Sequence, residues 1–195
     1  MTQIDRLESA IRVILRNKTR AYIAIDGMAA SGKTTLAQAL AQRFSSCTVV
    51  HMYDFTVPFD DRYPGYFETT LSNADIPRFK REVLSPLLRG EDACYRPYRC
   101  HPEAGFLDPI TIPAGCAVVI VEGAYCLHPD LFDHYDLRVL SVIDADTQRA
   151  RILARNGAAQ LERFLSAWIP MENRHIVQRG LRESCDLIIS PDPES

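Results

Sequence analysis

The chain has 195 residues, of which 47% are hydrophobic and 24% are charged, and its formal net charge is −3. This composition is typical of a globular protein and excludes the disordered, collagen-like and fibrous classes. The length predicts one domain with an embellishment rather than two full domains. No apolar run approaches the roughly 18 to 20 residues that a bilayer-spanning helix needs.

The N-terminal segment and the cysteines indicate the cellular location of the protein. Acidic residues stand where a signal peptide would have basic ones, and no apolar stretch follows, so we expect a cytoplasmic protein with no membrane partner. None of the six cysteines form CxxC pairs, which predicts free thiols and no zinc site. The net charge offers no attraction to a polyphosphate backbone, so we expect no nucleic-acid partner.

Helical and strand patterns alternate along most of the chain. Helical spacing of apolar residues predicts a leading helix over residues 3–17. Short apolar runs predict buried strands at 21–26, 47–52, 117–121, 137–143 and 187–189. Further helices are expected at 36–44, 77–89, 146–155 and 159–179. This alternation is typical of right-handed βαβ units and predicts an α/β doubly wound domain.

Residues 53–116 interrupt the alternation with a segment too long and too rich in turns to be a single crossover. Most of the phenylalanine and tyrosine residues of the chain fall between residues 53 and 106. Two interpretations remain open for these rings. They form a small core under an insertion, or they line a substrate cap with stacking surfaces.

A phosphate-binding motif follows the first predicted strand. The sequence GMAASGKTT over residues 27–35 matches GxxxxGK[ST] and lies between a strand and a helix, the context that this motif requires. Its glycines let backbone amides close around phosphates at a helix N-terminus. The nucleotide-binding residues are expected to be Gly27, Ala29, Ala30, Ser31, Gly32, Lys33, Thr34 and Thr35. Lys33 would bridge the β and γ phosphates, and the Thr34 hydroxyl would bind Mg²⁺.

Two acids come directly after predicted parallel strands, where ligands gather in open α/β sheets. Glu122 follows the third strand and is either a surface acid or the carboxylate that holds Mg²⁺, directly or through water. Asp54 follows the second strand and is either a turn residue or the base that orients and deprotonates an acceptor hydroxyl.

A helix that begins near Asp144 carries several arginines. Asp144 and Asp146 are interpreted as capping residues without a catalytic role. Arg151 and Arg155 are four residues apart and share one helix face. They form either a solvated helix end or a lid that neutralises a migrating phosphoryl group.

Taken together, the motifs GMAASGKTT, VVHMYDF, YRPYRCH, IVEGAY and VIDADTQRARILARN resemble the uridine kinase and phosphoribulokinase family of P-loop kinases. The resemblance spans roughly residues 20–192. It implies a P-loop NTPase three-layer sandwich with a five-stranded parallel sheet in the order 2-3-1-4-5. It further implies a single domain over 1–195, with an acceptor cap at about 53–116 and a lid at about 149–165.

The resemblance also implies an activity: transfer of the γ-phosphate of ATP, with Mg²⁺, to a hydroxyl group of a small molecule. Lys33, Asp54, Arg151 and Arg155 would then be catalytic, and Thr34 and Glu122 would hold the metal. The acceptor would contact Asp54, Asp75, Tyr98 and His101, although a plain hairpin edge is the alternative for the segment around Tyr98. Kinases of this kind are often homo-oligomers, but no sequence feature identifies an interface.

The acceptor itself stays open at this stage. A nucleoside such as uridine or cytidine is favoured, but Arg151 lacks the second adjacent arginine of uridine kinases, and the spacing from Tyr98 to His101 is tighter than theirs. Sugar phosphates, pantothenate and nicotinamide riboside are alternatives within the kinase class. A nucleotide switch that binds a protein partner is the alternative outside it, although no NKxD guanine-reading motif is present.

Overall fold

A computed structural model describes residues 2–58, 61, 62, 64, 66, 72–100 and 105–190. Its centre is a parallel sheet in the order β2-β5-β1-β6-β7. The strands are β1 (Ala21–Gly27), β2 (Cys47–His51), β5 (Val118–Glu122), β6 (Leu137–Ser141) and β7 (Leu187–Ile189). Numbered by their sequence among these five strands, the order is 2-3-1-4-5, so the expected topology is confirmed.

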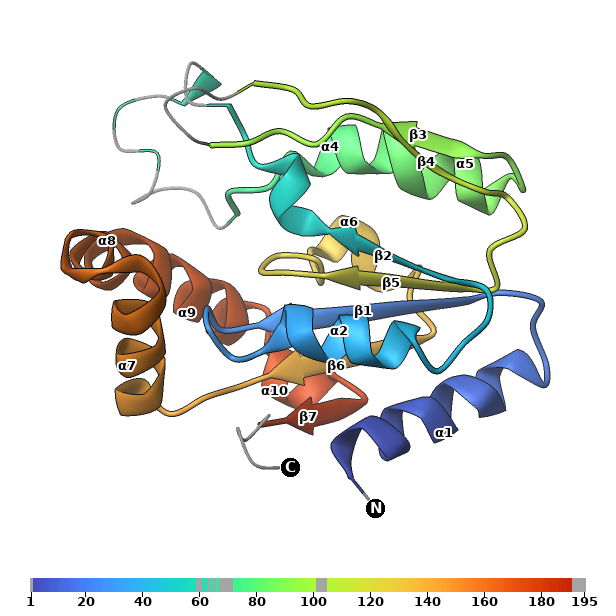
Figure 1. Ribbon diagram of the computed structural model, residues 1–195, viewed down its shortest axis with the longest axis horizontal. Helices are drawn as coiled ribbons and strands as arrows, with labels where there is room; N and C mark the ends of the chain where they lie inside the picture. The colour runs from blue at the N-terminus through green and yellow to red at the C-terminus, as the bar shows by residue number, and fades with distance from the viewer. Residues whose placement is uncertain are drawn as a thin grey trace.

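Helices cover both faces of this sheet (Figure 1). All seven residues of β1 are buried, because a parallel sheet between two helical layers has no solvated face. On one face, α1 (Gln3–Leu15) and α2 (Lys33–Ala41) pack Leu7, Ile11 and Leu40 against strand residues such as Ile23. The opposite face is covered by α6 (Pro129–Phe132), α9 (Ile169–Gln178) and α10 (Leu181–Ser184). The expected three-layer sandwich is therefore present.

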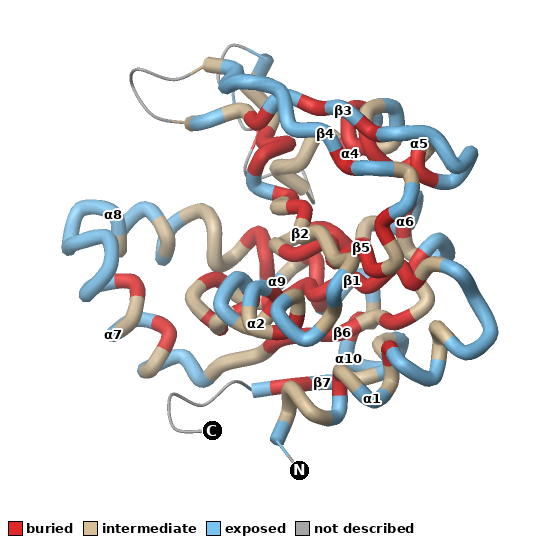
Figure 2. Tube along the Cα trace, turned by 45° about the vertical axis from the view of Figure 1, so that its right-hand side comes forward, coloured by how far each residue is buried: buried red, intermediate tan, exposed pale blue. Residues whose placement is uncertain are grey.

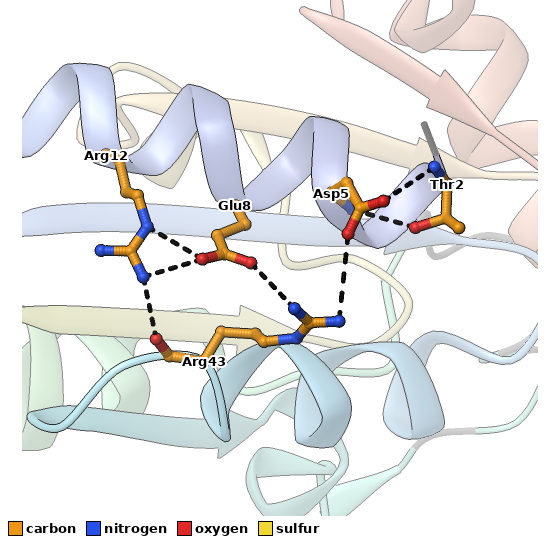
Figure 3. Close-up of polar contacts among 5 residues, drawn as sticks. All are labelled: Thr2, Asp5, Glu8, Arg12 and Arg43. Carbon is orange, nitrogen blue, oxygen red and sulfur yellow. Dashed lines mark hydrogen bonds and ion pairs between the residues drawn. The ribbon is translucent and has the colours of Figure 1, made fainter.

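The leading helix α1 is fixed at its start and along its exposed side (Figure 3). Thr2 and Asp5 form a capping box, in which each side chain accepts the backbone amide of the other. Glu8 pairs with Arg12 on its own helix and with Arg43, which lies just beyond α2. These exposed pairs add little stability, so burial of the apolar face dominates the docking of α1.

The described residues of the segment 52–116 form a separate layer beyond the β2 edge of the sheet (Figure 1). Its elements are η1 (Met52–Phe55), the consecutive helical pieces α4 (Ile76–Phe79), η3 (Lys80–Leu84) and α5 (Ser85–Leu88), and the hairpin of β3 (Ala93–Tyr95) with β4 (Ile110–Ile112). The rings of Phe55, Phe79 and Tyr95 pack together in its buried core. Tyr53 and Phe106, by contrast, are 55% and 45% exposed.

The C-terminal third supplies a helical arm that stands beyond the end of the sheet (Figure 1). It consists of α7 (Ala145–Asn156), α8 (Ala158–Arg163) and η4 (Phe164–Trp168), and it leads into α9. Asp144 caps α7 by accepting the Thr147 amide, as expected, and Gly157 turns the chain between α7 and α8 with φ 78°. Figure 2 shows that α8 is largely exposed, whereas α9 returns into the buried body of the protein.

Two observations complete the architecture. The helix after the phosphate motif begins at Lys33 rather than at residue 36, because the loop runs directly into its first turn. Among the described residues, no helix combines the length and the apolar character that crossing a membrane demands.

Candidate functional site

The GMAASGKTT segment forms a tight loop between β1 and α2. Gly27 has φ 135°, and a Cβ atom at this position would lie 1.9 Å from the Ser141 carbonyl oxygen of the neighbouring strand β6. Gly32 has φ 90° and caps α2 without a side-chain hydrogen bond. Ala30 also has a positive φ, 60°, which is unusual for a residue other than glycine. The loop geometry therefore depends on glycine at two places and is strained at a third.

The loop has the features of an anion-binding cradle. The N-terminus of α2 carries the partial positive charge of the helix, and no side chain caps it. Lys33 is 9% exposed, and its Nζ donates to the carbonyl oxygens of Gly27 at 2.9 Å and Met28 at 2.7 Å. The buried ammonium group thus lies against the loop and has no acid as a hydrogen-bond partner among the described residues. These features fit a polyphosphate.

The expected metal residues meet at the mouth of this loop. Thr34 Oγ1 donates to Glu122 Oε1 at 3.0 Å, which joins the start of α2 to the end of β5. Glu122 is 5% exposed, and Gly123 behind it turns with φ 129° against Met52. A hydroxyl and a buried carboxylate are the oxygen ligands that suit Mg²⁺, so this pair fits the metal. Among the described residues, no three or more His, Cys, Asp or Glu side chains are grouped so that they could hold a metal ion.

His51 is a neighbour of Glu122 that the sequence does not single out. Its Nδ1 lies 2.6 Å from Glu122 Oε1, and both residues end adjacent parallel strands. The hydrogen bond to Glu122 raises the pKa of His51, and the charge of Asp54 acts in the same direction. His51 therefore lies within the electrostatic reach of both carboxylates of the site.

Asp54 lies in η1, directly after β2, with only 4% of its surface exposed. Tyr95 donates its hydroxyl hydrogen to Asp54 Oδ2 at 3.3 Å. Burial raises the pKa of Asp54, and the charges of His51 and Arg99 oppose that rise. A carboxylate with a raised pKa and few partners is suited to accept a proton.

Arg78 is a second residue that the sequence analysis missed. It is 5% exposed, and its guanidinium lies 4.6 Å from the ring centroid of Phe55 and 5.2 Å from that of Phe106. It donates to the backbone carbonyl of Asp54 and pairs with Glu82 at 3.8 Å. Arg78 thus fixes the backbone that carries Asp54. No motif could reveal it, since the contact joins α4 to η1.

Two of the expected acceptor residues, Tyr98 and Asp75, lie in the same layer as Asp54. Tyr98 is half-buried, its amide donates to the Asp54 carbonyl at 2.8 Å, and its ring packs edge-on against Phe106. The carboxylate of Asp75 caps α4 by accepting the Arg78 amide at 3.0 Å. His101 lies outside the described residues.

The structure places the two expected lid arginines differently. Arg151 Nη1 donates to the carbonyl of Ala30, within the phosphate loop, at 3.1 Å. Arg155 is exposed and donates to Asn156, its neighbour in sequence, at 2.8 Å. Of the pair, Arg151 alone contacts the phosphate loop.

A buried polar network supports the loop from below. Asp26 is 1% exposed and accepts the amides of Gly27, Tyr125 and Leu127. His175 Nε2 lies 3.2 Å from Asp26 Oδ2. Burial alone would raise the pKa of Asp26, but His175 and these amides hold it below its usual value. The network ties β1 to α9 and to the turn after β5.

The fold of the described residues is similar to the folds of several solved kinase structures. A possible uridine kinase from Bacillus stearothermophilus has a similar structure, with a TM-score of 0.72 and 21% identity over 97% of this chain and 100% of that one. A candidate fructose transport system kinase from a Silicibacter species matches with a TM-score of 0.77 and 23% identity, with the same coverage of both chains. The fold expected from the sequence is therefore confirmed.

Sequence comparison adds a different kind of relative. The chain is 29% identical over 184 residues to the tRNA-specific adenosine deaminase subunit tad2 of Schizosaccharomyces pombe. The match covers 87% of this chain but only 43% of the relative, so the chain spans less than half of that protein. No family model matches the chain.

Proposed function

We propose that this protein is an ATP-dependent kinase that transfers the γ-phosphate of ATP to a hydroxyl group of a small metabolite. The observation that carries this proposal is the junction of three elements: the buried Lys33 on the phosphate loop, Thr34 bonded to Glu122, and the buried Asp54 beyond the next strand. These groups correspond to a phosphate cradle, a metal ligand pair and a base, which are the parts that phosphoryl transfer needs.

Each residue has a separate task in this proposal. Lys33 and the amides at the start of α2 bind the phosphates and stabilise charge on the transferred group. Thr34 and Glu122 hold Mg²⁺, which neutralises phosphate charge when it is bound. Asp54 orients the acceptor hydroxyl and takes its proton, and burial favours that proton transfer by raising the pKa of its carboxyl group. Arg151, beside the loop, and Arg155 neutralise the phosphoryl group from the lid at about 149–165.

We assign the acceptor site to the layer formed by residues 53–116. Its exposed rings, Tyr53 and Phe106, are available for stacking on a flat base, whereas Phe55, Phe79 and Tyr95 are core. Tyr98, Asp75 and His101 complete the proposed acceptor contacts. A nucleoside such as uridine or cytidine is the proposed substrate, the cytoplasm the proposed location, and the chain functions as a single domain.

The similarity to part of a tRNA deaminase subunit does not lead us to propose deamination. Zinc deaminases place two metal-binding cysteines in a P-C-x-x-C motif. This chain has no CxxC pair.

The proposal is tested by ADP release from Mg-ATP. Purified protein is assayed with uridine, cytidine, other nucleosides, nicotinamide riboside, pantothenate and sugar phosphates, with a control that lacks acceptor. A nucleoside should accelerate ADP release. Acceleration by another acceptor would support the kinase activity but exclude a nucleoside as the substrate. Release that no acceptor changes would favour a P-loop ATPase switch with a protein partner.

A further inference from the structure

The middle of the phosphate loop is held from outside by three side chains. The amide of Ala29 donates to Glu172 Oε2 at 2.8 Å, and the carbonyl of Ala29 accepts from Gln148 Nε2 at 3.0 Å. The next carbonyl, that of Ala30, accepts from Arg151 Nη1. Gln148 and Arg151 lie on α7, and Glu172 lies on α9. Two helices far along the chain thus bind both polar groups of one loop residue.

These contacts lie next to a strained backbone position of the loop. Ala30 has φ 60°, a left-handed conformation that is unfavourable for a residue with a Cβ atom. Such a conformation persists only where surrounding contacts over-determine it. Gln148 and Arg151, which bind the carbonyls of Ala29 and Ala30, fix the two peptide groups that flank this strained position. Glu172, which binds the Ala29 amide, fixes the peptide group just before them.

The hydrogen bonds of Glu172 and Gln148 to the loop are shielded from solvent. Glu172 is 9% exposed and Gln148 is 3% exposed, so water competes little for either hydrogen bond. Glu172 is held among Lys33, Asp26 and His175, and burial raises its pKa to about 7 although Lys33 opposes the rise. An acid at such a position is unfavourable for folding, because its charged form loses solvation. Its hydrogen bond to the Ala29 amide explains why an acid stands at this buried position.

We propose that Glu172 is a positioning residue of the nucleotide site, which holds the Ala29 amide and thereby keeps the phosphate loop in the shape that binds nucleotide. Gln148 has the matching task at the Ala29 carbonyl. Neither residue is required to touch the phosphates. The inference rests on the nucleotide site of the proposed function and is independent of which acceptor is phosphorylated.

The test is direct binding of a fluorescent ADP analogue with Mg²⁺ to the full chain, which needs no acceptor and no turnover. Glu172→Ala removes the partner of the buried amide and should weaken binding by about tenfold or more. Glu172→Gln keeps an oxygen that can accept the Ala29 amide, so it should bind within about threefold of the parent protein. Glu183→Ala, at an exposed position of α10, is the matched control and should leave binding unchanged.

Thermal unfolding separates positioning from folding. The variants are compared well below their melting temperatures, so a role limited to stability would lower the melting temperature and leave the Kd for nucleotide unchanged. Gln148→Ala is a second test variant, which should also weaken nucleotide binding. It tests the proposal if Glu172→Ala does not fold. A folded Glu172→Ala or Gln148→Ala with the parent affinity would overturn the proposal. So would a Glu172→Gln variant as weak as Glu172→Ala. If the parent protein itself bound no nucleotide, the proposed function would fail first.

Discussion

At the scale of single residues, the nucleotide site depends most on Lys33. Its ammonium group is buried against the loop carbonyls and is thereby held at the phosphate cradle before any ligand arrives. Burial restricts its rotamers, so little conformational entropy remains to be lost on binding. In the proposed mechanism, phosphoryl transfer needs both the charge and the position of this one side chain.

Lys33→Ala should therefore abolish acceptor-dependent ADP release, because it removes the charge that stabilises the transferring phosphoryl group. Steady-state kinetics at saturating ATP measures the effect. Lys18→Ala is the matched control, since the Lys18 side chain is 59% exposed and pairs with Asp136. Full activity in the Lys33 variant would refute the assignment of the site.

Asp54→Asn should lower kcat by about 10² or more while ATP binding stays largely intact, because the amide cannot accept the proton of the acceptor hydroxyl. Kinetics and nucleotide binding are measured on the same preparation. Asp133→Asn, an exposed position after α6, controls for the loss of one carboxylate. Loss of ATP affinity instead would mean that Asp54 acts through the metal.

The site residues that can be predicted from the sequence differ from those that cannot in the range of their contacts. Lys33, Thr34 and Glu122 are recognisable because their roles follow from a local motif or from the position after a strand. His51, Arg78, Gln148 and Glu172 are not, since each acts through a contact with a distant segment, such as Gln148 with Ala29, 119 residues away. Such contacts depend on tertiary packing and leave no local pattern.

At the scale of elements, β1, the phosphate loop and β6 are packed closely together where they join. A Cβ atom on Gly27 would lie 1.9 Å from the Ser141 carbonyl oxygen and would also have to adopt φ 135°. The first strand and the loop can therefore join only through glycine at this position.

Gly27→Ala should lower the free energy of unfolding by about 2 kcal/mol or more, through overpacking and backbone strain. Urea-induced unfolding measures this difference. Gly115→Ala is the matched control, because Gly115 has an ordinary φ and open space around its Cα, and it should change stability by no more than about 0.5 kcal/mol. Equal effects of the two substitutions would contradict the packing argument.

The strands and long helices were predictable from periodicity because each buries one face or both. Val118–Glu122, for example, is an uninterrupted buried run. In the layer of residues 52–116, the helix expected at 77–89 is present as α4, η3 and α5, whereas the π-helical turn and the hairpin were not predicted. Its helix passes through the π-helical turn Lys80–Leu84, and its hairpin pairs three residues on each side. Elements this short carry too few residues to show a period.

At the scale of the whole molecule, the buried acid on α9 links stability to pH. Burial raises the pKa of Glu172 to about 7 from its usual value of 4.5. The folded protein therefore keeps a proton that the unfolded chain has already lost. The contribution of Glu172 to the free energy of unfolding is therefore fully present below about pH 4.5 and is lost as the pH rises toward 7.

Glu172→Gln cannot ionise, so its stability relative to the parent protein should rise between pH 5 and pH 8. Urea-induced unfolding of both proteins at the two pH values measures this change. The sign follows from linkage, since the parent protein loses stability in this window and the variant lacks that loss. A difference that does not vary with pH would show that Glu172 titrates normally.

The central claim, that the chain is a kinase rather than a nucleotide switch, is tested most directly by following the γ-phosphate itself. Protein is incubated with Mg²⁺ and ATP labelled at the γ-phosphate, together with the acceptor that best stimulates ADP release. The account predicts that the label appears in a phosphorylated organic product in equal amount to the ADP formed, and that Asp54→Asn suppresses both. Label recovered only as inorganic phosphate would contradict it.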